Sequence, residues 1–435
     1  MARMIHALTS STRSKVILAV TVVLLICTAV GLSQALSWFK PPVEALAAIP
    51  TWDELTGDLP ADSDNAALLY ERAFTTADLE YPEALVVEEI LHSRRSPDVE
   101  ELAELRALLE GREEAIALVH EATALRDCAY SLVPREGIAG DFPHVRGTDD
   151  ILLVESARAL VAAEEGEFGV AFEALADGVH CGRMAFKGMP ALKTFLVEVR
   201  AVERACEATQ IILANGQPAP EHVGPLADAL REVDLEADLV TAMRGEAAWG
   251  VAVFDSAMGQ VQGRPASVLK HGAPGWKRYP MPKAYVKANR RVFIEEMARV
   301  IETSSRPYRA STALLQETPR EFPGYARLAA MMVPTLKVPM LRRDETIAWQ
   351  HMCLAALEIT AKGDAPETLA DLRTPADDAL VRDVFSGNHL RYARTADGYL
   401  LYSLGRDLDD DGGVPQQHTG HAADCDGDLV WSAGA

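Results

Sequence analysis

The stretch 151–186 reads ILLVESARALVAAEEGEFGVAFEALADGVHCGRMAF and is the most regular part of the chain. Apolar residues recur at helical spacing from Ile151 to Glu164 and again from Phe168 to Phe186. Between the two runs stands Glu165-Gly166-Glu167, a segment short enough for a tight turn. The stretch therefore predicts a helical hairpin, and with it a mainly α fold.

The same rhythm of helices and turns continues on both sides of this hairpin. Ser96 and Pro97, followed by acidic residues, mark the start of a helix that extends to about Asp127, with Gly111 as the point where it can divide. No fixed period repeats, so an array of helical pairs and an irregular helical bundle both remain open. Further helices are expected at roughly 191–214, 220–233, 236–260, 324–333 and 344–362.

Composition divides the chain into segments. Prolines in 40–64 predict an extended spacer, and the glycines and prolines of 263–282 predict a linker between two helical parts. The expected segments are 1–15 (cytoplasmic and basic), 16–39 (transmembrane helix), 40–64 (spacer), 65–262 (helical domain), 263–282 (linker), 283–362 (second helical segment), 363–413 (β tail) and 414–435 (disordered).

The N-terminal part contains the one long apolar run of the sequence. Val16–Leu32 has no charged residue, and Val16–Phe39 supplies the roughly 20 apolar residues that a membrane-spanning helix needs. Arg13 and Lys15 precede it without any acidic residue, which predicts a single span in the cytoplasmic membrane, with the N-terminus inside and the bulk of the chain extracytoplasmic. The alternative is a signal peptide cleaved near Ala35, which would leave a secreted protein.

The charge of the chain argues against nucleic acid as a partner. Only four of the 42 basic residues lie at or before position 40, and no acidic residue precedes Glu44. The remainder therefore has a net charge of about −26. Such a surface repels phosphate backbones.

The six cysteines contain no Cys-x-x-Cys pair, so a zinc ribbon or a redox motif is not indicated. One or two disulfides remain open for the five that follow Cys27, and so does a role as small buried apolar residues.

A β-hairpin is predicted near the C-terminus. Leu390, Tyr392 and Tyr399 belong to two short runs of β-type residues, separated by the turn sequence Thr395-Ala396-Asp397-Gly398. The hairpin should cover 388–404. The glycine- and aspartate-rich residues that follow it predict a loose end.

Carboxylates gather in the sequence DLDDDGG, residues 407–413. Acidic residues at alternate positions before a turning glycine resemble the first half of a calcium loop, because Ca²⁺ takes six to eight oxygen ligands. His418 stands where an EF-hand has its bidentate glutamate, and no helix flanks the loop, so an EF-hand is excluded. Asp407, Asp409 and Asp411 are the candidate calcium ligands, and a solvated acidic tail is the alternative.

A second group of metal-binding residue types lies within eleven residues of the C-terminal segment. Its histidines are three apart, which suits a zinc site, but no partner pair exists elsewhere, and a disordered segment without metal is the favoured interpretation. The group consists of His418, His421, Asp424, Cys425, Asp426 and Asp428.

The order of short motifs after Gly363 carries a resemblance. Asp383-Val384-Phe385-Ser386-Gly387 is followed by Asp397-Gly398-Tyr399 and by Leu401-Tyr402-Ser403-Leu404-Gly405. This order is similar to the globular tail of the major pseudopilins of type II secretion, in which an Asp-Pro-aromatic-Gly turn and a Tyr-x-x-x-Ser-x-Gly strand lead into a calcium loop. The resemblance covers about 70 of the 435 residues and implies that Asp407, Asp409 and Asp411 bind calcium.

The chain also departs from that family. Val384 replaces the proline of the turn, and the N-terminus lacks the Gly-Phe-Thr-Leu-x-Glu processing site. The helical body, with Arg126-Asp127-Cys128 and the hairpin at 151–186, resembles a group of uncharacterised, membrane-anchored bacterial proteins that end in the same tail. No activity follows from this resemblance.

The sequence contains no recognisable catalytic motif. His120-Glu121 lacks the second histidine of a zinc-protease helix, and neither a Walker loop nor a Gly-x-Ser-x-Gly elbow occurs. We therefore expect a non-enzymatic interaction or scaffold protein with an unidentified protein partner. One alternative is a cell-surface hydrolase, which requires a cavity holding two titratable groups within hydrogen-bond reach. Another is an accessory component of a secretion or pilus-like machine.

Overall fold

The computed structural model describes residues 43–47, 49–130, 143–258, 282–307, 310, 321–372, 381–395, 398–416 and 427–433. The expected transmembrane helix at 16–39 lies outside the described residues, as does nearly all of the expected linker at 263–282. None of the helices within the described ranges is both long and apolar enough to cross a membrane. The described part is mainly helical and includes a small antiparallel sheet, as the sequence predicts.

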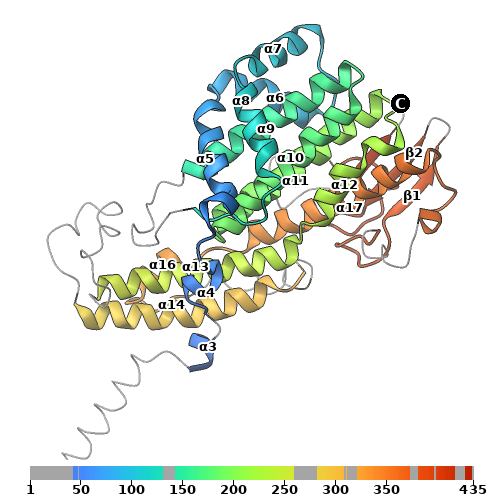
Figure 1. Ribbon diagram of the computed structural model, residues 1–435. Coiled ribbons are helices and arrows are strands. Elements are labelled where there is room, and N and C mark those ends of the chain that lie inside the picture. Colours follow the sequence, from blue (N-terminus) through green and yellow to red (C-terminus); the bar gives the residue numbers. More distant parts are fainter. Residues whose placement is uncertain are drawn as a thin grey trace, which may run out of the picture.

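Three long helices pack side by side at the centre of the fold (Figure 1). They are α9 (Pro143–Glu164), α10 (Phe168–Gly188) and α11 (Leu192–Asn215). The turn between α9 and α10 confirms the predicted helical hairpin. Gly166 there has a φ of +80°, a left-handed conformation that glycine adopts without steric cost, and the N–H groups of Gly166 and Glu167 donate back to carbonyls of α9.

Shorter helices cover one side of α9 (Figure 1). They are α5 (Ala66–Thr76), α6 (Tyr81–Ser93), α7 (Val99–Leu109) and α8 (Glu113–Ala122). Gly111, with a φ of +81°, separates α7 from α8, at the point that the sequence indicates. The N-cap of α7 is Asp98 rather than Ser96, because its carboxylate accepts hydrogen bonds from the N–H groups of Glu100 and Glu101.

The C-terminal tail forms a sheet in the order β1-β2-β3. The strands are β1 (Arg391–Arg394), β2 (Tyr399–Ser403) and β3 (Leu429–Ala433). Strands β1 and β2 confirm the predicted hairpin. The expectation that 414–435 is disordered is wrong for β3, whose Trp431 pairs with Leu401 and is fully buried. Long-range packing orders β3, and the glycines and acids around it give no local sign of this.

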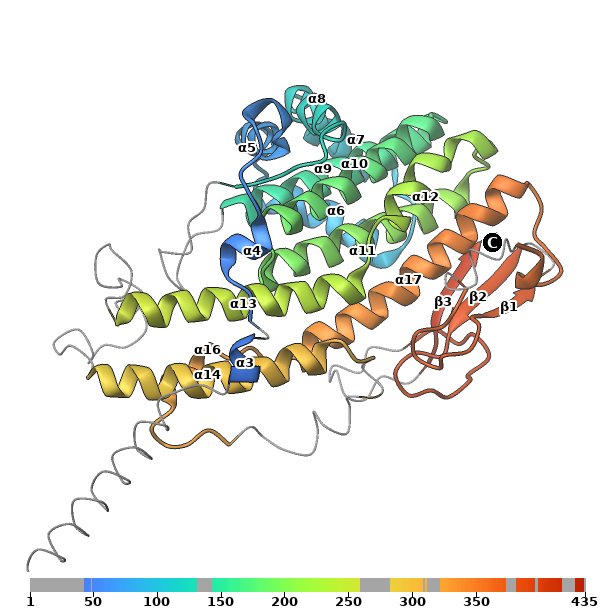
Figure 2. The ribbon, with the colours of Figure 1, turned by 60° about the horizontal axis from the view of Figure 1, so that its bottom comes forward.

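The remaining helices connect the central layer to the sheet. They are α12 (Gly224–Arg231), α13 (Leu235–Ala257), α14 (Lys283–Ser304), α16 (Arg327–Met332) and α17 (Lys337–Lys362). Figure 2 shows α13 and α14 side by side, with α17 running from them to the sheet. One cluster of buried apolar side chains extends from Leu79 to Trp431, so the helices on both sides of the expected linker share a core.

The surroundings of α11 distinguish a bundle from a repeat array. This helix packs against α9, α10, α13, α17 and β3, which come from four separate parts of the chain. In an array of repeats each unit contacts only its neighbours in sequence. The helical body is therefore an irregular bundle.

The expectation of an extended spacer at 40–64 is wrong. This segment contains the short helices α3 (Val43–Ala47) and α4 (Trp52–Thr56), and a 3₁₀ turn at Asp62–Asp64. Pro50 and Pro60 stand between these elements, where they do not interrupt a helix. Helix α4 begins with a capping box of Thr51 and Glu54 and is fixed to the body by an edge-to-face contact, 5.9 Å between ring centroids, of Trp52 with Trp249.

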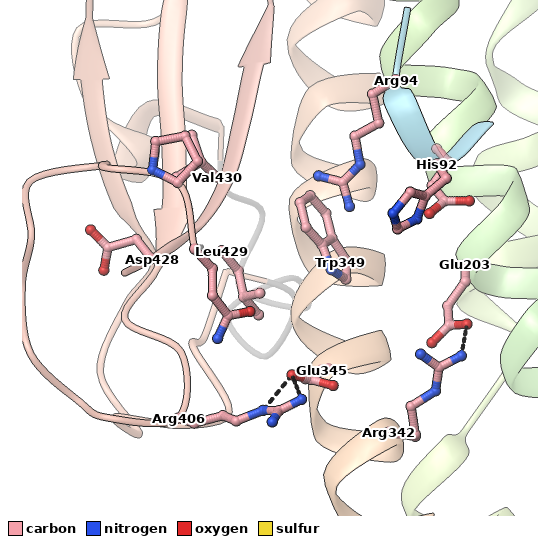
Figure 3. Close-up of a pocket in the computed structure, with 13 residues that line it drawn as sticks. His92, Arg94, Glu203, Arg342, Glu345, Trp349, Arg406, Asp428, Leu429 and Val430 are labelled. Carbon is pink, nitrogen blue, oxygen red and sulfur yellow. Dashed lines mark hydrogen bonds and ion pairs between the residues drawn. The ribbon is translucent and has the colours of Figure 1, made fainter. Parts of the chain in front are cut away.

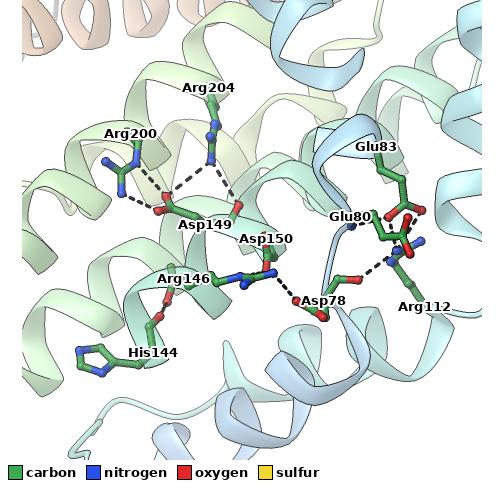
Figure 4. A network of polar contacts seen from close by, with 11 residues as sticks. Asp78, Glu80, Glu83, Arg112, His144, Arg146, Asp149, Asp150, Arg200 and Arg204 are labelled. Carbon is green, nitrogen blue, oxygen red and sulfur yellow. Dashed lines mark hydrogen bonds and ion pairs between the residues drawn. The ribbon is translucent and has the colours of Figure 1, made fainter. Parts of the chain in front are cut away.

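A network of ion pairs joins the segment between α5 and α6 to α9 and α11 (Figure 4). Arg146 Nη2 lies 2.8 Å from Asp78 Oδ1, and Arg200 binds Asp149 through two hydrogen bonds of 2.7 and 2.6 Å. Arg204 adds a 3.3 Å bond from Nη1 to the Asp149 carbonyl. The Arg146-Asp78 pair is exposed, and a single pair of this kind contributes little stability. Arg200, Arg204 and Asp149 are partly buried, so their contacts fix α11 against α9.

Close packing of α13 against the corner between α10 and α11 gives a testable prediction. A Cβ atom at Gly245 would overlap the carbonyl oxygen of Pro190. Gly245→Ala should lower the free energy of unfolding by roughly 2 kcal/mol or more, because backbone must move to admit the methyl group. Gly224→Ala is the matched control, since open space surrounds Gly224, and its change should stay within about 1 kcal/mol. Urea unfolding followed by circular dichroism measures both; equal effects would contradict the prediction.

Candidate functional site

A cavity of about 480 Å³ lies where the helical body meets the C-terminal tail (Figure 3). The body contributes the C-terminal end of α6 and one face each of α11 and α17, and the tail contributes the start of β3 and parts of 405–416. This volume is in the range of small-molecule sites. Unlike most such sites, its lining is rich in charged side chains.

Two ion pairs border the cavity. Glu203 of α11 accepts a 2.7 Å hydrogen bond from Arg342 Nη2 and a 2.8 Å bond from the Thr346 hydroxyl. Glu345 of α17 accepts a 2.6 Å bond from Arg406 Nε. Because Arg406 belongs to the tail, the second pair joins the two walls of the cavity. Figure 3 shows both pairs at the same end of the cavity, with Trp349 between the walls.

A cation–π contact forms the opposite end. The guanidinium of Arg94 lies 3.7 Å from the centroid of the Trp349 ring. Arg94 caps the C-terminus of α6 with a φ of 50°, a left-handed conformation that glycine usually supplies at this position. An arginine here has a side chain that reaches over α17, which a glycine would lack.

Burial changes the acidity of the cavity residues. Burial raises the pKa of Glu203 to about 7, although the positive charge of Arg342 acts to lower it. Burial also raises the pKa of Glu207, which lies one helical turn further along α11. Burial lowers the pKa of Arg94, which the nearby carboxylate of Glu207 partly offsets. Glu203 therefore exchanges its proton near neutral pH.

The predicted calcium ligands lie together in the loop after β2. The side chains of Asp407 and Asp409 are exposed, and that of Asp411 is half-buried. Asp407 Oδ2 accepts a 3.2 Å bond from the Gly427 N–H, which ties the loop to the approach of β3. No group of three acidic, histidine or cysteine side chains within the described ranges has the arrangement of a metal site.

Asp410 is not among the predicted calcium ligands, and its side chain binds other residues of the protein. Its carboxylate accepts a 3.0 Å bond from the Tyr402 hydroxyl and a 3.1 Å bond from Arg391 Nε. These two hydrogen bonds hold the loop against β1 and β2.

Asp428 joins the loop to the cavity. It is fully buried, and its Oδ2 accepts a 2.8 Å bond from the Gly413 N–H, whereas Oδ1 has no hydrogen-bond partner among the described residues. Burial raises its pKa, and the nearby carboxylates of Asp410, Asp411 and Asp407 raise it further. Figure 3 shows its carboxylate directed away from Trp349 and Glu345. The other members of its sequence cluster lie outside the described residues.

Sequence reasoning missed the cavity because its residues come from distant parts of the chain. One local signal was present: Glu203 and Glu207 lie one turn apart on the half-buried stripe of α11 that also carries Arg200 and Arg204. Two half-buried acids on the central helix require an explanation, since removing a charge from water is costly. At this cavity Glu203 is in hydrogen-bond contact with Arg342, whose guanidinium stays protonated.

The fold and the cavity together define a mainly helical protein whose small antiparallel sheet closes a polar site. No family model matches the chain, and neither the curated proteins nor the solved structures include a significantly similar one.

The raised pKa of Glu203 predicts a pH dependence. Between its ordinary value of 4.5 and its folded value of about 7, the folded chain holds a proton that the unfolded chain has released. The contribution of Glu203 to the free energy of unfolding therefore falls as the pH rises through this window. Between these two pH values the free energy of unfolding of Glu203→Gln should therefore fall by about 3 kcal/mol less than that of the parent.

Urea unfolding at several pH values between 4 and 8 measures the effect. The exposed Glu104→Gln is the matched control and should keep the slope of the parent. A weakened contact with Arg342 shifts the whole curve of Glu203→Gln without changing its slope. Parallel curves for parent and Glu203→Gln would therefore disprove the assignment.

Proposed function

We propose that the protein is a membrane-anchored, extracytoplasmic binding protein that holds a small polar ligand between its helical body and a calcium-stabilised C-terminal tail. One observation carries the proposal: the charged cavity at this junction is bordered by an ion pair, Arg406 to Glu345, that joins its two walls. The anchor rests on the apolar run 16–39.

The chemistry of the lining favours a zwitterionic ligand such as an amino acid or the end of a peptide. Arg94, Arg342 and Arg406 offer hydrogen-bond donors to an anionic group. Glu203 and Glu207 offer acceptors to an ammonium group on the opposite wall. A ligand with both charges can replace the existing ion pairs without leaving a buried charge unpaired. Among the residues that the structure describes, none of those lining the cavity is a serine, threonine or cysteine.

Calcium binding by the tail is supported by Asp428. An acidic cluster alone indicates little, but Asp428 is a fully buried carboxylate beside Asp407 and Asp411, and one of its oxygens lacks a partner among the described residues. A bound cation would neutralise this group of carboxylates and supply that oxygen with a partner. Two motifs of the pseudopilin resemblance also meet in the fold, because the Ser403 hydroxyl donates a 2.6 Å bond to Asp383 Oδ1. We infer that Asp407, Asp409, Asp411 and Asp428 bind Ca²⁺, with backbone carbonyls completing its coordination.

A hydrolase is the second candidate, and one observation favours it. Glu203 and Glu207 lie one turn apart in the cavity, and burial raises the pKa of both, as general acid–base catalysis requires. The ion pair of Glu203 with Arg342 argues for a binding role instead. Mass spectrometry of the ligand mixtures described below separates the two: new cleavage products would favour the hydrolase.

The ligand proposal predicts binding of amino acids or dipeptides to the full-length protein in detergent. Calorimetry with glutamate, lysine, arginine and their dipeptides should detect at least one ligand. Arg342→Gln should weaken its binding tenfold or more, a loss of about 1.4 kcal/mol, because a guanidinium that pairs with the anionic group is removed.

Arg299→Gln is the matched control, since Arg299 is exposed on α14 and distant in sequence from the cavity residues. It should bind like the parent. Absence of heat with every probe, or equal affinities of the two variants, would contradict the proposal.

The calcium proposal predicts one Ca²⁺ per chain, bound with a dissociation constant on the order of micromolar to millimolar. Asp428→Asn keeps the acceptor for the Gly413 N–H but lowers the charge, so it should weaken binding at least tenfold. The triple change of Asp407, Asp409 and Asp411 to Ala should abolish it. Asp62→Asn, at an exposed site outside the tail, is the control. Calorimetry that finds no calcium heat in the parent would end this part of the proposal.

A further inference from the structure

Helix α3 fixes the chain to the body close to the expected membrane anchor. It starts at Val43, four residues after Phe39, the last residue of the apolar run. Ala45 of α3 and Ile49, just after it, pack against the main hydrophobic cluster. Figure 2 shows α3 lying against α14, and the two helices are in contact. The chain therefore joins the body at the surface of α14.

The short connection limits the distance between α14 and a bilayer. A chain spans at most about 3.6 Å per residue, so the four steps from Phe39 to Val43 cover no more than about 14 Å. Helix α3 adds about 7 Å, and packed helices lie about 8 to 10 Å apart. If 16–39 spans the membrane, α14 lies within roughly 30 Å of the hydrocarbon edge, and any bend in the connection brings it nearer to the head groups.

The first half of α14 is basic, in contrast to the rest of the chain. Residues 282–294 contain four basic residues and no acidic one, whereas the chain beyond position 40 has a net charge of about −26. Lys283 and Lys287 are exposed, and within the described ranges neither has an ion-pair partner. These two ammonium groups are therefore available to an anion outside the protein.

The two arginines that follow are paired with acids of the protein. Arg290 Nε lies 2.8 Å from Asp255 Oδ1, and Arg291 Nε lies 2.8 Å from Glu295 Oε1. A neighbouring carboxylate offsets most of the field of each guanidinium. The attraction of this half of α14 for an external anion therefore comes mainly from the lysines.

We propose that the first half of α14 docks on the surface of the membrane that anchors the chain, and that Lys283 and Lys287 bind its anionic lipid head groups. The inference rests on the proposed anchor at 16–39 and does not depend on ligand binding in the cavity. An acidic body is repelled by anionic lipid, so a basic face beside the anchor determines which side turns to the bilayer. Lysine suits this contact, because its flexible ammonium group can follow mobile phosphate groups.

Lysine labelling in reconstituted vesicles tests the docking. Full-length protein in vesicles of phosphatidylcholine, with or without phosphatidylglycerol, is acetylated and analysed by mass spectrometry. Acetylation of Lys283 and Lys287 should be about threefold slower or more in the anionic vesicles, and high salt should remove the difference because it screens the charges. Lys362, exposed at the end of α17, is the matched control and should react equally in both.

Flotation of the same samples in high salt tests the anchor separately. A chain that floats with both kinds of vesicle, but whose Lys283 and Lys287 label equally in the two, keeps the anchor and overturns the docking. A chain that detaches in high salt, yet has protected lysines in low salt, supports the docking surface and contradicts the anchor. A chain that floats with neither kind and shows no protection contradicts both.

Charge reversal gives a second measurement. Lys283→Glu places an acid in the first turn of α14, where it suits the helix dipole, so the variant should fold like the parent. Acetylation of Lys287 in the anionic vesicles should rise to the rate found with phosphatidylcholine alone. Lys362→Glu should leave Lys287 protected. Protection that persists in Lys283→Glu, or that is lost equally in both variants, would contradict the assignment.

Discussion

The burial of α11 is the constraint on which the rest of the structure depends. Most of its side chains are buried, and α9, α10, α13, α17 and β3 surround it. Every one of these elements gains its apolar contacts by packing on this helix or on its immediate neighbours. Removing apolar surface from water stabilises a fold by about 25 cal/mol for each Å². A helix surrounded on this many sides therefore holds segments from residue 143 to residue 433 in one core.

The same burial produces the unusual electrostatics of the protein. Glu198, Glu203 and Glu207 all lie on α11, and burial raises the pKa of each of them. Glu198 is fully buried, and neither carboxylate oxygen has a hydrogen-bond partner among the described residues, so it is held in its protonated form. Glu203 and Glu207, by contrast, border the cavity, where arginines from α6 and α17 face them. One buried helix thus carries both a neutral interior acid and the candidate site.

Some features could be predicted because they depend on neighbours in sequence. The turn at Gly166, the break at Gly111 and the β1–β2 hairpin follow from periodicity and from residues that favour left-handed or turn conformations. The order of β3 and the helices within 40–64 could not be predicted, because Trp431 and Trp52 are fixed by contacts with Leu401 and Trp249, which are distant in sequence. The calcium candidates were found as a local run of aspartates, yet Asp428, the buried carboxylate beside them, lies beyond the intervening loop.

The sequence by itself determined the mainly helical class, the central hairpin, the C-terminal strands β1 and β2 and the apolar run at 16–39, because helical period, turn residues and hydropathy are local properties. Only the tertiary structure decided that the helices form a bundle rather than an array, and that Glu203, Trp349 and Arg406 border one cavity. These residues meet only after α11 and α17 pack and β3 completes the sheet. The acidity of Glu203 was decided at the same step, since a carboxyl group acquires a raised pKa from its loss of solvent and not from its place in the sequence.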